Sequence, residues 1–212
     1  MSTLRPYEYR CFADHGVSTV LEANARAGLI DVPLIQVCPS TRAAGPARTV
    51  RCGQGDNLAV HAVLKQIRSG EILVLSMPEP EAVALMGELM VRQARMRGAA
   101  GILVDGAVRD VEQLQSLGVP IWTRFIRART ATKRHAGAVN VPVSIGNCAV
   151  APGDVVVLDA DGGVVVESAR AMAVLDACRE REQREQAVRA EIERGAFTFD
   201  LYGMQAAFDG SI

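Results

Sequence analysis

The sequence predicts a single α/β domain in which parallel strands alternate with helices. Its 212 residues are enough for one domain with a sizeable core and too few for two. Hydrophobic residues make up 49% of the chain but aromatic residues only 4%, so Val, Ile, Leu and Ala must fill the core, as in a sheet flanked by helices. Residues 71–77 form an almost continuous apolar run, typical of a strand covered on both faces. Helices and apolar strands alternate from Ile67 to Leu117, so we expect parallel βαβ geometry there.

Three elements are expected near the N-terminus. An amphipathic helix should run from Gly16 to Ala27, with Gly28 at its C-cap position. Residues 44–47, Ala-Gly-Pro-Ala, indicate a loop. Residues 48–52 alternate between polar and apolar side chains, which predicts a strand.

A helix is expected to follow residues 53–57 and to end near Ile67, because its apolar residues have helical spacing. Asp56 stands directly before this helix. We interpret Asp56 as the N-cap, a common position for aspartate, and keep a ligand role as the alternative.

The second half of the chain predicts more strands. Residues 121–125 alternate like a strand, and residues 139–145 form another candidate that Pro142 confines to an edge or a bulge. Two Val-rich runs, 155–158 and 164–166, flank a Gly-containing turn, which predicts a β-hairpin.

A long helix is expected over residues 168–194. It is rich in Ala, Glu and Arg, and its charge density rises after Cys178. Because its later half has few apolar anchors, among them Val188 and Ile192, it should project from the body or rest on a neighbouring subunit. Residues 197–212 form a short tail with aromatic anchors.

Composition argues against several classes of protein. With 23 basic and 24 acidic residues the net charge is −1, so there is no electrostatic footprint for nucleic acid or an anionic membrane. There is no apolar leader and no apolar stretch long enough for a membrane helix, so we expect a soluble, cytoplasmic protein. The five cysteines are scattered and indicate reduced core thiols, and the three histidines are isolated, so no zinc site or catalytic dyad is visible locally.

Charged residues concentrate between Gly87 and Asp110, where an apolar run should continue. A helix from about residue 88 to 97, a tight turn, and a strand over 102–104 ending at Asp105-Gly106 would carry the chain out and back. This unit can bring Glu88 close to Arg109 and Asp110, at the carboxyl end of a parallel strand, where α/β proteins bind ligands.

This stretch has both a structural and a chemical interpretation. Asp110 with Gln113 matches the capping-box pattern, Glu88 could favour the positive end of its helix, and Arg109 could be a surface residue. Together, however, the carboxylates and the arginine suit a hard divalent cation such as Mg²⁺, with Arg109 stabilising charge on a substrate oxygen.

Two neighbouring features add to this interpretation. Gly87 opens the helix and lets an anion approach the N–H groups of Leu89 and Met90. A basic segment contains Arg127, Arg129, Lys133, Arg134 and His135. We favour a solvated or subunit-contact loop for this segment over substrate binding.

Seven segments of the chain also carry a family resemblance: Ala44-Gly45-Pro46-Ala47, Gly55-Asp56-Asn57, Gly87-Glu88-Leu89-Met90, Asp105-Gly106-Ala107-Val108-Arg109-Asp110, Val139-Asn140-Val141-Pro142-Val143, Pro152-Gly153-Asp154 and Asp161-Gly162-Gly163-Val164. Through them nearly the whole chain resembles the class II pyruvate aldolases typified by 4-hydroxy-4-methyl-2-oxoglutarate/4-carboxy-4-hydroxy-2-oxoadipate aldolase, a family that includes the RraA-type regulators of ribonuclease E. An acidic residue, twenty residues and then Arg-Asp is the pattern of the aldolase branch. The regulator branch shares Arg-Asp but generally lacks the acidic partner.

The resemblance implies a single swivelling β/β/α (RraA-like) domain over residues 1–212, with a long C-terminal helix. It also implies assembly as trimers or dimers of trimers, with the site between subunits. By position, Asp110 would bind Mg²⁺ or Mn²⁺ directly and Glu88 would hold a metal-bound water. An acidic residue on the neighbouring subunit's C-terminal helix would complete the water shell; Glu185 is our choice by spacing, and Glu182 the alternative.

The same resemblance implies the chemistry. Arg109 would bind the 2-oxo oxygen of the pyruvyl unit, and the N–H groups of Leu89 and Met90 its carboxylate. The implied reaction is retro-aldol cleavage of a 4-hydroxy-2-oxo acid to pyruvate, in which metal and Arg109 stabilise an enolate that a metal-bound water protonates. Oxaloacetate decarboxylation would use the same enolate.

The sequence departs from the family pattern at two positions. Glu88 stands where the family often has Asp, and Asn147 interrupts a turn that is usually rich in Gly. A carboxylate that is one methylene longer can still reach through water, so the aldolase remains the leading hypothesis. The alternative is an RraA-like trimeric regulator of an RNA-processing enzyme, without catalysis.

Overall fold

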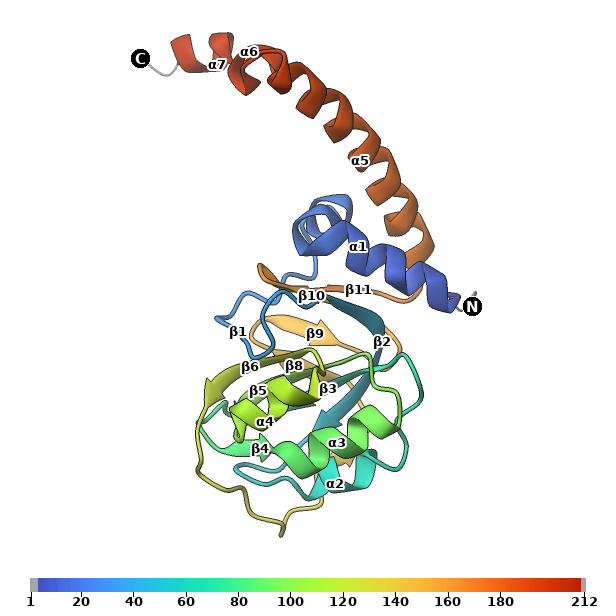
Figure 1. The fold of residues 1–212 in the computed structure, drawn as a ribbon, viewed down its shortest axis with the longest axis vertical. Coiled ribbons are helices and arrows are strands. Elements are labelled where there is room, and N and C mark those ends of the chain that lie inside the picture. The colour runs from blue at the N-terminus through green and yellow to red at the C-terminus, as the bar shows by residue number, and fades with distance from the viewer. Residues whose placement is uncertain (1–3, 211–212) are drawn as a thin grey trace.

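A mixed β-sheet forms the centre of the molecule (Figure 1), and the computed structural model describes residues 4–210. Within those residues the sheet has nine strands, in the order β1-β6-β5-β3-β2-β10-β11, with β4 beside β5 and β7 beside β2. The strands are β1 Ile35–Gln36, β2 Ala43–Arg51, β3 Ile72–Ser76, β4 Ala84–Met86, β5 Gly101–Val108, β6 Ile121–Ile126, β7 Ala138–Val139, β10 Val155–Asp159 and β11 Gly162–Val166. A separate hairpin consists of β8 Val143–Ile145 and β9 Cys148–Val150.

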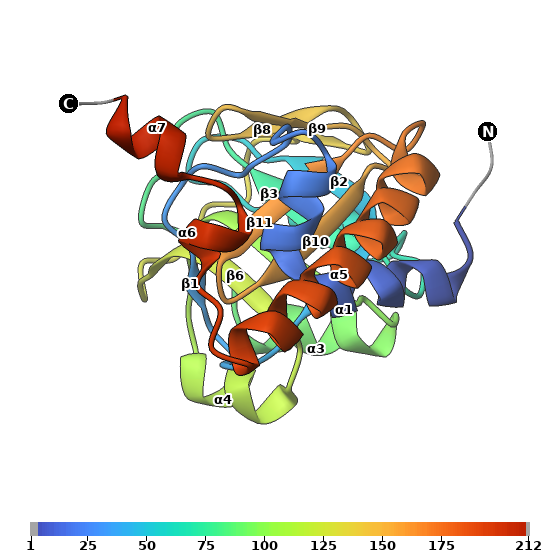
Figure 2. The ribbon, with the colours of Figure 1, turned by 90° about the horizontal axis from the view of Figure 1, so that it is seen from above.

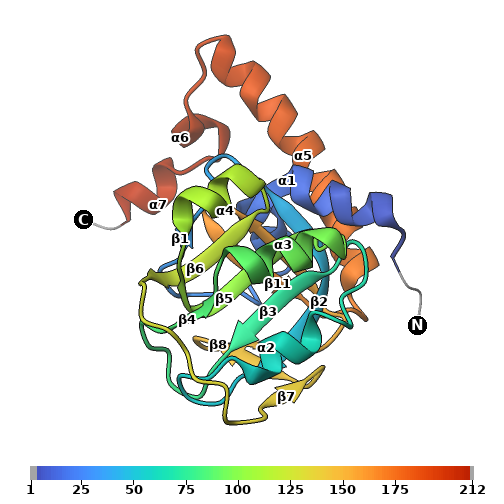
Figure 3. The same cartoon turned by 60° about the horizontal axis from the view of Figure 1, so that its bottom comes forward.

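The middle of the sheet is parallel, as the alternation of helices and apolar strands predicts. Strands β2, β3, β5 and β6 pair in parallel, and β4 is parallel to β5. Helices α2 Leu58–Val63, α3 Glu88–Met96 and α4 Val111–Leu117 cover one face of these strands (Figure 3). Aliphatic side chains from both layers form one buried cluster there, including Val60, Leu75, Val91 and Leu114.

The remaining layers lie on other parts of the sheet. The hairpin β8–β9 and part of β10 contribute to a second buried cluster, which contains Trp122. Helices α1 Pro6–Ala23 and α5 Ala171–Glu193 pack over β10 and β11 (Figure 2). Phe12 and Leu175 lie in this third cluster, so the first and last long helices close the same side of the molecule.

Helix α5 carries a C-terminal arm, which we define as residues 179–210. The first turns of α5 pack on the body with the buried side chains of Val174, Leu175 and Cys178, whereas the arm is mostly exposed. Helices α6 Thr198–Leu201 and α7 Gln205–Asp209 contain no buried residue and contact each other through the edge-to-face rings of Phe199 and Phe208. The arm therefore projects from the body (Figure 1), as the scarcity of apolar anchors predicts.

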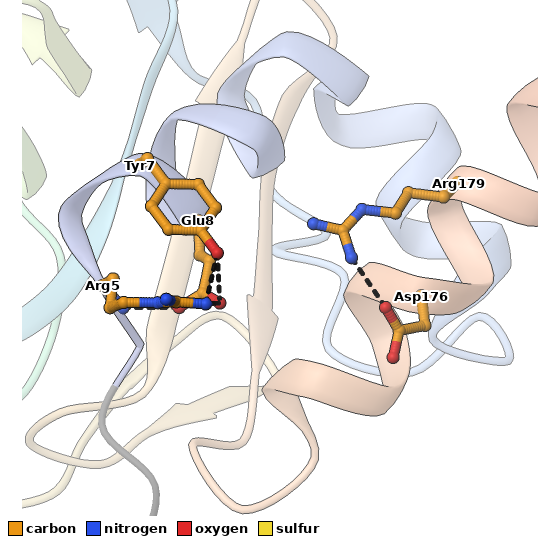
Figure 4. Close-up of polar contacts among 5 residues, drawn as sticks. All are labelled: Arg5, Tyr7, Glu8, Asp176 and Arg179. Atoms are coloured by element: carbon orange, nitrogen blue, oxygen red, sulfur yellow. Dashed lines mark hydrogen bonds and ion pairs between the residues drawn. The ribbon is translucent and has the colours of Figure 1, made fainter.

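Polar contacts lie at the start of α1 and within α5 (Figure 4). The Glu8 carboxylate accepts the Arg5 backbone N–H at 2.5 Å, which holds the first turn of α1, and Arg5 also contacts Tyr7. On α5, Arg179 donates to Asp176 at 2.7 Å, one turn away.

In the part of the chain described, no helix is both long and apolar enough to cross a membrane.

The structure corrects the predicted N-terminal helix. Helix α1 begins at Pro6, ten residues before the predicted start, and Gly16 lies at a kink inside it with φ 79°. Gly28 is not its C-cap; Asn24 is. A side chain at Gly28 would place its Cβ 1.9 Å from the Val165 carbonyl oxygen, so this glycine is needed where the chain passes close to β11.

Three further predictions were wrong in their bounds. Residues 44–47 are not a loop but belong to β2; Pro46 pairs only with β10, outside the ladder with β3, where a missing N–H is tolerated. Residues 139–145 are divided at Pro142 into β7 and β8. Helix α2 ends at Val63 and does not reach Ile67.

The most consequential difference concerns β4 and β5. Strand β5 does not end at Asp105-Gly106; it continues through a register shift to Val108. The short strand β4 lies beside it and was not predicted. All three of its residues are buried, so no alternation marks it in the sequence.

Candidate active site

Two adjacent parallel strand ends build the candidate site. Met86, the last residue of β4, is in register with Val108, the last residue of β5, and the Arg109 N–H donates to the Met86 carbonyl at 3.2 Å. Gly87 and Glu88 therefore leave one strand next to the point where Arg109 and Asp110 leave the other. The carboxyl ends of parallel strands are the usual ligand sites of α/β proteins.

The side chains of this region contact one another directly. Asp110 Oδ2 accepts the Glu88 backbone N–H at 3.0 Å and lies 3.6 Å from Arg109 Nε. Arg109 Nη1 donates to Thr130 Oγ1 at 2.9 Å. The guanidinium is thus held from two sides while about 40% of the side chain stays exposed.

Asp110 does not form the capping box that its sequence pattern indicates. It occupies the N-cap position of α4, but its carboxylate makes no cap hydrogen bond and points to α3 instead. Its backbone has left-handed angles, φ 63° and ψ 41°, which cost about 1 kcal/mol for a non-glycine residue. Such strain concentrates at functional sites, because the surrounding structure must hold it.

Gly87 is required by the close approach of two side chains. A Cβ at this position would lie 2.5 Å from Asp110 Oδ2 and 3.0 Å from Arg109 Nε. Its φ of −140° is open to any residue, so the need for glycine is steric and not conformational.

These residues line one pocket of about 320 Å³, which we call the site pocket. All six site residues that the sequence predicts within one chain contribute to its wall. The structure adds Asn57, His61 and Thr130, which sequence reasoning missed. It also places Lys133 in the wall, although the sequence favours a solvated or subunit-contact loop for its segment. The lining residues are Asn57, His61, Ala84, Met86, Gly87, Glu88, Leu89, Met90, Gln93, Arg109, Asp110, Thr130 and Lys133.

Two of the added residues carry polar atoms that lack partners. Among residues 4–210, nothing forms a hydrogen bond with Asn57 Oδ1 or His61 Nε2, although both atoms are buried. The Asn57 amide nitrogen donates to the Leu85 carbonyl at 3.0 Å, which fixes the orientation of the group. Buried polar atoms without partners are costly, so they mark a wall suited to a polar ligand or to water.

The Glu88 carboxylate is engaged on its own helix. Glu88 Oε1 accepts Arg92 Nε at 2.6 Å, one turn along α3. Among the first amides of α3, Met90 N–H donates to the Gly87 carbonyl at 3.1 Å, whereas Leu89 N–H has no acceptor within residues 4–210. Leu89 N–H is thus available to an anion at the positive end of this helix.

The two C-terminal candidates lie away from the site pocket of their own chain. Glu185 pairs with Arg181 at 2.8 Å and Arg189 at 3.0 Å along α5. Glu182 pairs with His15 at 2.8 Å. Helix α5 lies on the opposite side of the body from α3 and β4 (Figure 1), so within one chain neither residue reaches the site pocket.

The donor set fits a largely hydrated hard cation. No group of three or more His, Cys, Asp or Glu side chains able to hold a metal ion exists within the described residues. Asp110 uses Oδ2 for the Glu88 amide, and its other oxygen has no hydrogen bond to any described residue. One free carboxylate oxygen suits Mg²⁺ or Mn²⁺, which keep most of their waters.

A larger cavity, of about 520 Å³, lies near the amino end of β3. Its two most buried charged residues satisfy each other, because Arg48 donates to both oxygens of Glu71 at 3.0 and 2.6 Å. The site pocket, at the carboxyl ends of β4 and β5, is therefore the better candidate.

Comparison with known proteins identifies the family of this chain. The family model for RraA-like proteins, described as Aldolase/RraA, matches residues 15–166, which include the whole site pocket. The chain belongs to the RraA-like family. A protein of Halalkalibacterium halodurans, provisionally named a 4-hydroxy-4-methyl-2-oxoglutarate aldolase, is 32% identical over 158 residues, covering 74% of this chain and 75% of the relative.

Solved RraA-like structures share the fold. RraAS2 of Streptomyces coelicolor, described as an unusual member of the RNase ES inhibitor RraA protein family, is 29% identical with a TM-score of 0.78, covering 87% of this chain and 98% of that one. An uncharacterised protein of Pseudomonas syringae pv. tomato is 25% identical with a TM-score of 0.80, covering 93% and 97%. These neighbours confirm the predicted RraA-like fold.

Proposed function

We propose that this RraA-like chain is a divalent-metal-dependent lyase that cleaves a 4-hydroxy-2-oxo acid to pyruvate and a second oxo compound. The observation that carries the proposal is the convergence of Glu88, Arg109 and Asp110 at adjacent strand ends in one pocket. The acidic residue before Arg-Asp is the feature that favours an aldolase over a regulator. Oxaloacetate decarboxylation is proposed as a second use of the same site.

In this proposal Arg109 and the start of α3 bind the pyruvyl unit. Arg109 donates to the 2-oxo oxygen, and its orientation is supported by Thr130 and Asp110. The substrate carboxylate accepts from the N–H groups of Leu89 and Met90, of which that of Leu89 is already unpaired. When the C3–C4 bond breaks, the C4 hydroxyl loses its proton to solvent and becomes the carbonyl of the second product, while the electron pair of the bond passes into the pyruvyl unit. Arg109 stabilises the negative charge that develops on the former 2-oxo oxygen until a proton from water reaches C3 and gives pyruvate.

Asp110 would hold Mg²⁺ or Mn²⁺ directly, and Glu88 and Glu185 would do so through water. The bound ion would supply Lewis-acid polarisation of the 2-oxo group. Glu88 must turn from Arg92 to take this part, and its long side chain allows the movement.

A second copy of this chain would supply Glu185, in a trimer or a dimer of trimers. Support comes from the C-terminal arm, which projects from the body and exposes Phe197, Tyr202 and Phe208 by 72%, 56% and 61%. Large apolar side chains exposed together mark an interaction surface.

The test is turnover of a 4-hydroxy-2-oxo acid by the purified protein with Mg²⁺ or Mn²⁺, measured as pyruvate release. We expect release that stops with EDTA and returns with added metal. Absence of metal-dependent turnover on any 4-hydroxy-2-oxo acid and on oxaloacetate contradicts the proposal.

A second candidate function is regulation of an RNA-processing enzyme, favoured by the similarity to RraAS2 over nearly all of that chain. Recovery of such an enzyme in a pull-down with this protein, undiminished by Asp110→Ala, would support it. An aldolase whose activity is lost in Asp110→Ala supports the first candidate instead.

A further inference from the structure

Asp56 has a wider set of contacts than a helix cap needs. Its Oδ1 accepts the Leu58 N–H at 2.8 Å, but the N-cap of α2 is Asn57 and not, as predicted, Asp56. Its Oδ2 faces a different part of the chain and accepts Thr132 Oγ1 at 2.6 Å, Arg134 N–H at 2.6 Å and His135 N–H at 3.2 Å. One carboxylate thus joins the start of α2 to residues 130–135, which we call the bridging segment.

The carboxylate is fully buried, with 0% of the residue exposed. Burial alone would raise the pKa of Asp56, but the hydrogen bonds from Arg134, Thr132, Leu58 and His135 lower it well below its usual range. Asp56 is therefore ionised in the folded protein, and a buried charge of this kind is retained only where its donors stay in place.

The bridging segment forms part of the site pocket. Thr130 and Lys133 line it, and Thr130 accepts the hydrogen bond from Arg109. Short parallel bridges connect Thr130 to Ala84 and Thr132 to Asp56, so the segment is anchored at both the β4 and the α2 side. Backbone hydrogen bonds hold its middle, because the Thr132 N–H donates to the Gly55 carbonyl at 2.9 Å and the Asn57 N–H to the Thr132 carbonyl at 3.0 Å. The segment is otherwise without regular secondary structure, and the Asp56 carboxylate adds the contacts to Arg134 and His135 that follow.

We propose that Asp56 is a positioning residue whose carboxylate holds the bridging segment so that Thr130 orients Arg109 and Lys133 faces the pocket. This inference rests on the function proposed above. Asp56 touches neither substrate nor metal in it, because Asp56 is not part of the pocket wall. Asp56 therefore acts neither as a helix cap alone nor as a ligand of substrate or metal.

The test compares Asp56→Asn with Asp154→Asn. Asp154 is the matched control: it is also buried, and its carboxylate also accepts two backbone N–H groups, those of Ala151 and Ser168, but it does not line the site pocket. For Asp56→Asn we expect kcat to fall roughly tenfold to a hundredfold, since small displacements of orienting groups cost this much. Asp154→Asn should keep kcat within about twofold of the wild type. Equal kcat values for Asp56→Asn and wild type overturn the proposal.

Hydrogen exchange gives a readout that is independent of turnover. In Asp56→Asn the amides of Arg134 and His135 should exchange at least about tenfold faster, whereas in Asp154→Asn they should be unchanged. Unchanged exchange in Asp56→Asn contradicts the proposal. If the wild type shows no turnover, the proposed function fails by itself, and the affinity for oxalate with Mg²⁺ then decides the role of Asp56: a loss supports positioning, and an unchanged affinity overturns it.

Thr130→Val tests the route. If Asp56 acts through Thr130, kcat of the double variant Asp56→Asn/Thr130→Val should fall by less than the product of the two single effects. A fully multiplicative fall shows that the two residues act independently and overturns the route through Thr130.

Discussion

The backbone N–H of Glu88 donates to the carboxylate of Asp110 at 3.0 Å, which joins the start of α3 to the end of β5. This bond exists because β4 and β5 end in register, so residues separated by a whole helix and a turn meet. The second oxygen of Asp110 has no hydrogen bond to any described residue, so it remains available to a cation.

Gly87→Ala should disable the site without unfolding the protein. The new Cβ would displace the ends of the Asp110 and Arg109 side chains, which can move, while the backbone angles remain allowed. We expect kcat/KM to fall by about a hundredfold and the melting temperature to change little. The control is Gly210→Ala, at a glycine outside the pocket with φ −81°. The kcat/KM and the melting temperature of that variant should match those of the wild type.

Arg109→Lys should cut turnover strongly while folding stays intact. Lysine keeps the charge but loses the planar fork that can contact Thr130 and a substrate oxygen together. We expect kcat to fall by about a hundredfold, measured as pyruvate release, with unchanged circular dichroism. Kinetics like the wild type's would remove Arg109 from the mechanism.

The Glu88–Arg92 pair should compete with metal binding. In Arg92→Ala the Glu88 carboxylate loses its partner at 2.6 Å, so Mn²⁺ affinity should rise a few-fold, whereas in Glu88→Gln it should fall. Titration calorimetry measures both. Arg95→Ala, which removes another positive charge from α3, is the control for net charge. Equal gains in Arg92→Ala and Arg95→Ala would mean that the pairing itself has no effect.

Two inactive variants should complement each other if Glu185 serves the neighbouring subunit. Arg109→Lys and Glu185→Gln, mixed under conditions that allow subunit exchange, should recover about a quarter of wild-type activity, because that share of randomly mixed sites has both residues intact. A site made within one chain gives no recovery. Glu182→Gln, mixed in the same way, tests the alternative residue, which here pairs with His15.

Asp56 should make stability depend on pH in the acid range. Its pKa is lowered in the folded state, so its contribution is complete above the unfolded value of about 3.9 and is lost as pH falls toward the lower folded value. Urea unfolding at pH 6 and pH 3 should show that the free-energy difference between wild type and Asp56→Asn narrows at pH 3. A constant difference would contradict this linkage.

Much of the fold follows from the sequence because its signals are local. Periodicity or composition predicts the apolar strand β3, the Gly-containing hairpin of β10 and β11, and the long charged helix α5. The same holds for the helix start at Gly87 and Glu88. The family pattern added the expected site residues, and those within one chain line one pocket.

Local sequence signals failed where a segment becomes a strand because of the strand that it pairs with. Strand β4 is three buried residues long, and it is a strand only because β5 lies beside it. Pro46 can lie in β2 because the pairing of β2 with β3 begins one residue later, at Ala47. Such outcomes depend on which segments pack together, and the periodicity within one segment does not predict its pairing partner.

Apolar spacing and residue chemistry are properties of short stretches, so they suffice to predict the parallel α/β core, the projecting helix and a candidate site at Glu88, Arg109 and Asp110. Packing between distant segments makes β4 and β5 end together, and it directs the Asp110 carboxylate to α3 instead of to its own helix. It also brings Asn57, Thr130 and Lys133 into the pocket. These relationships rest on hydrogen bonds and contacts between segments far apart in the chain, and their free energy exists only once the whole sheet has formed.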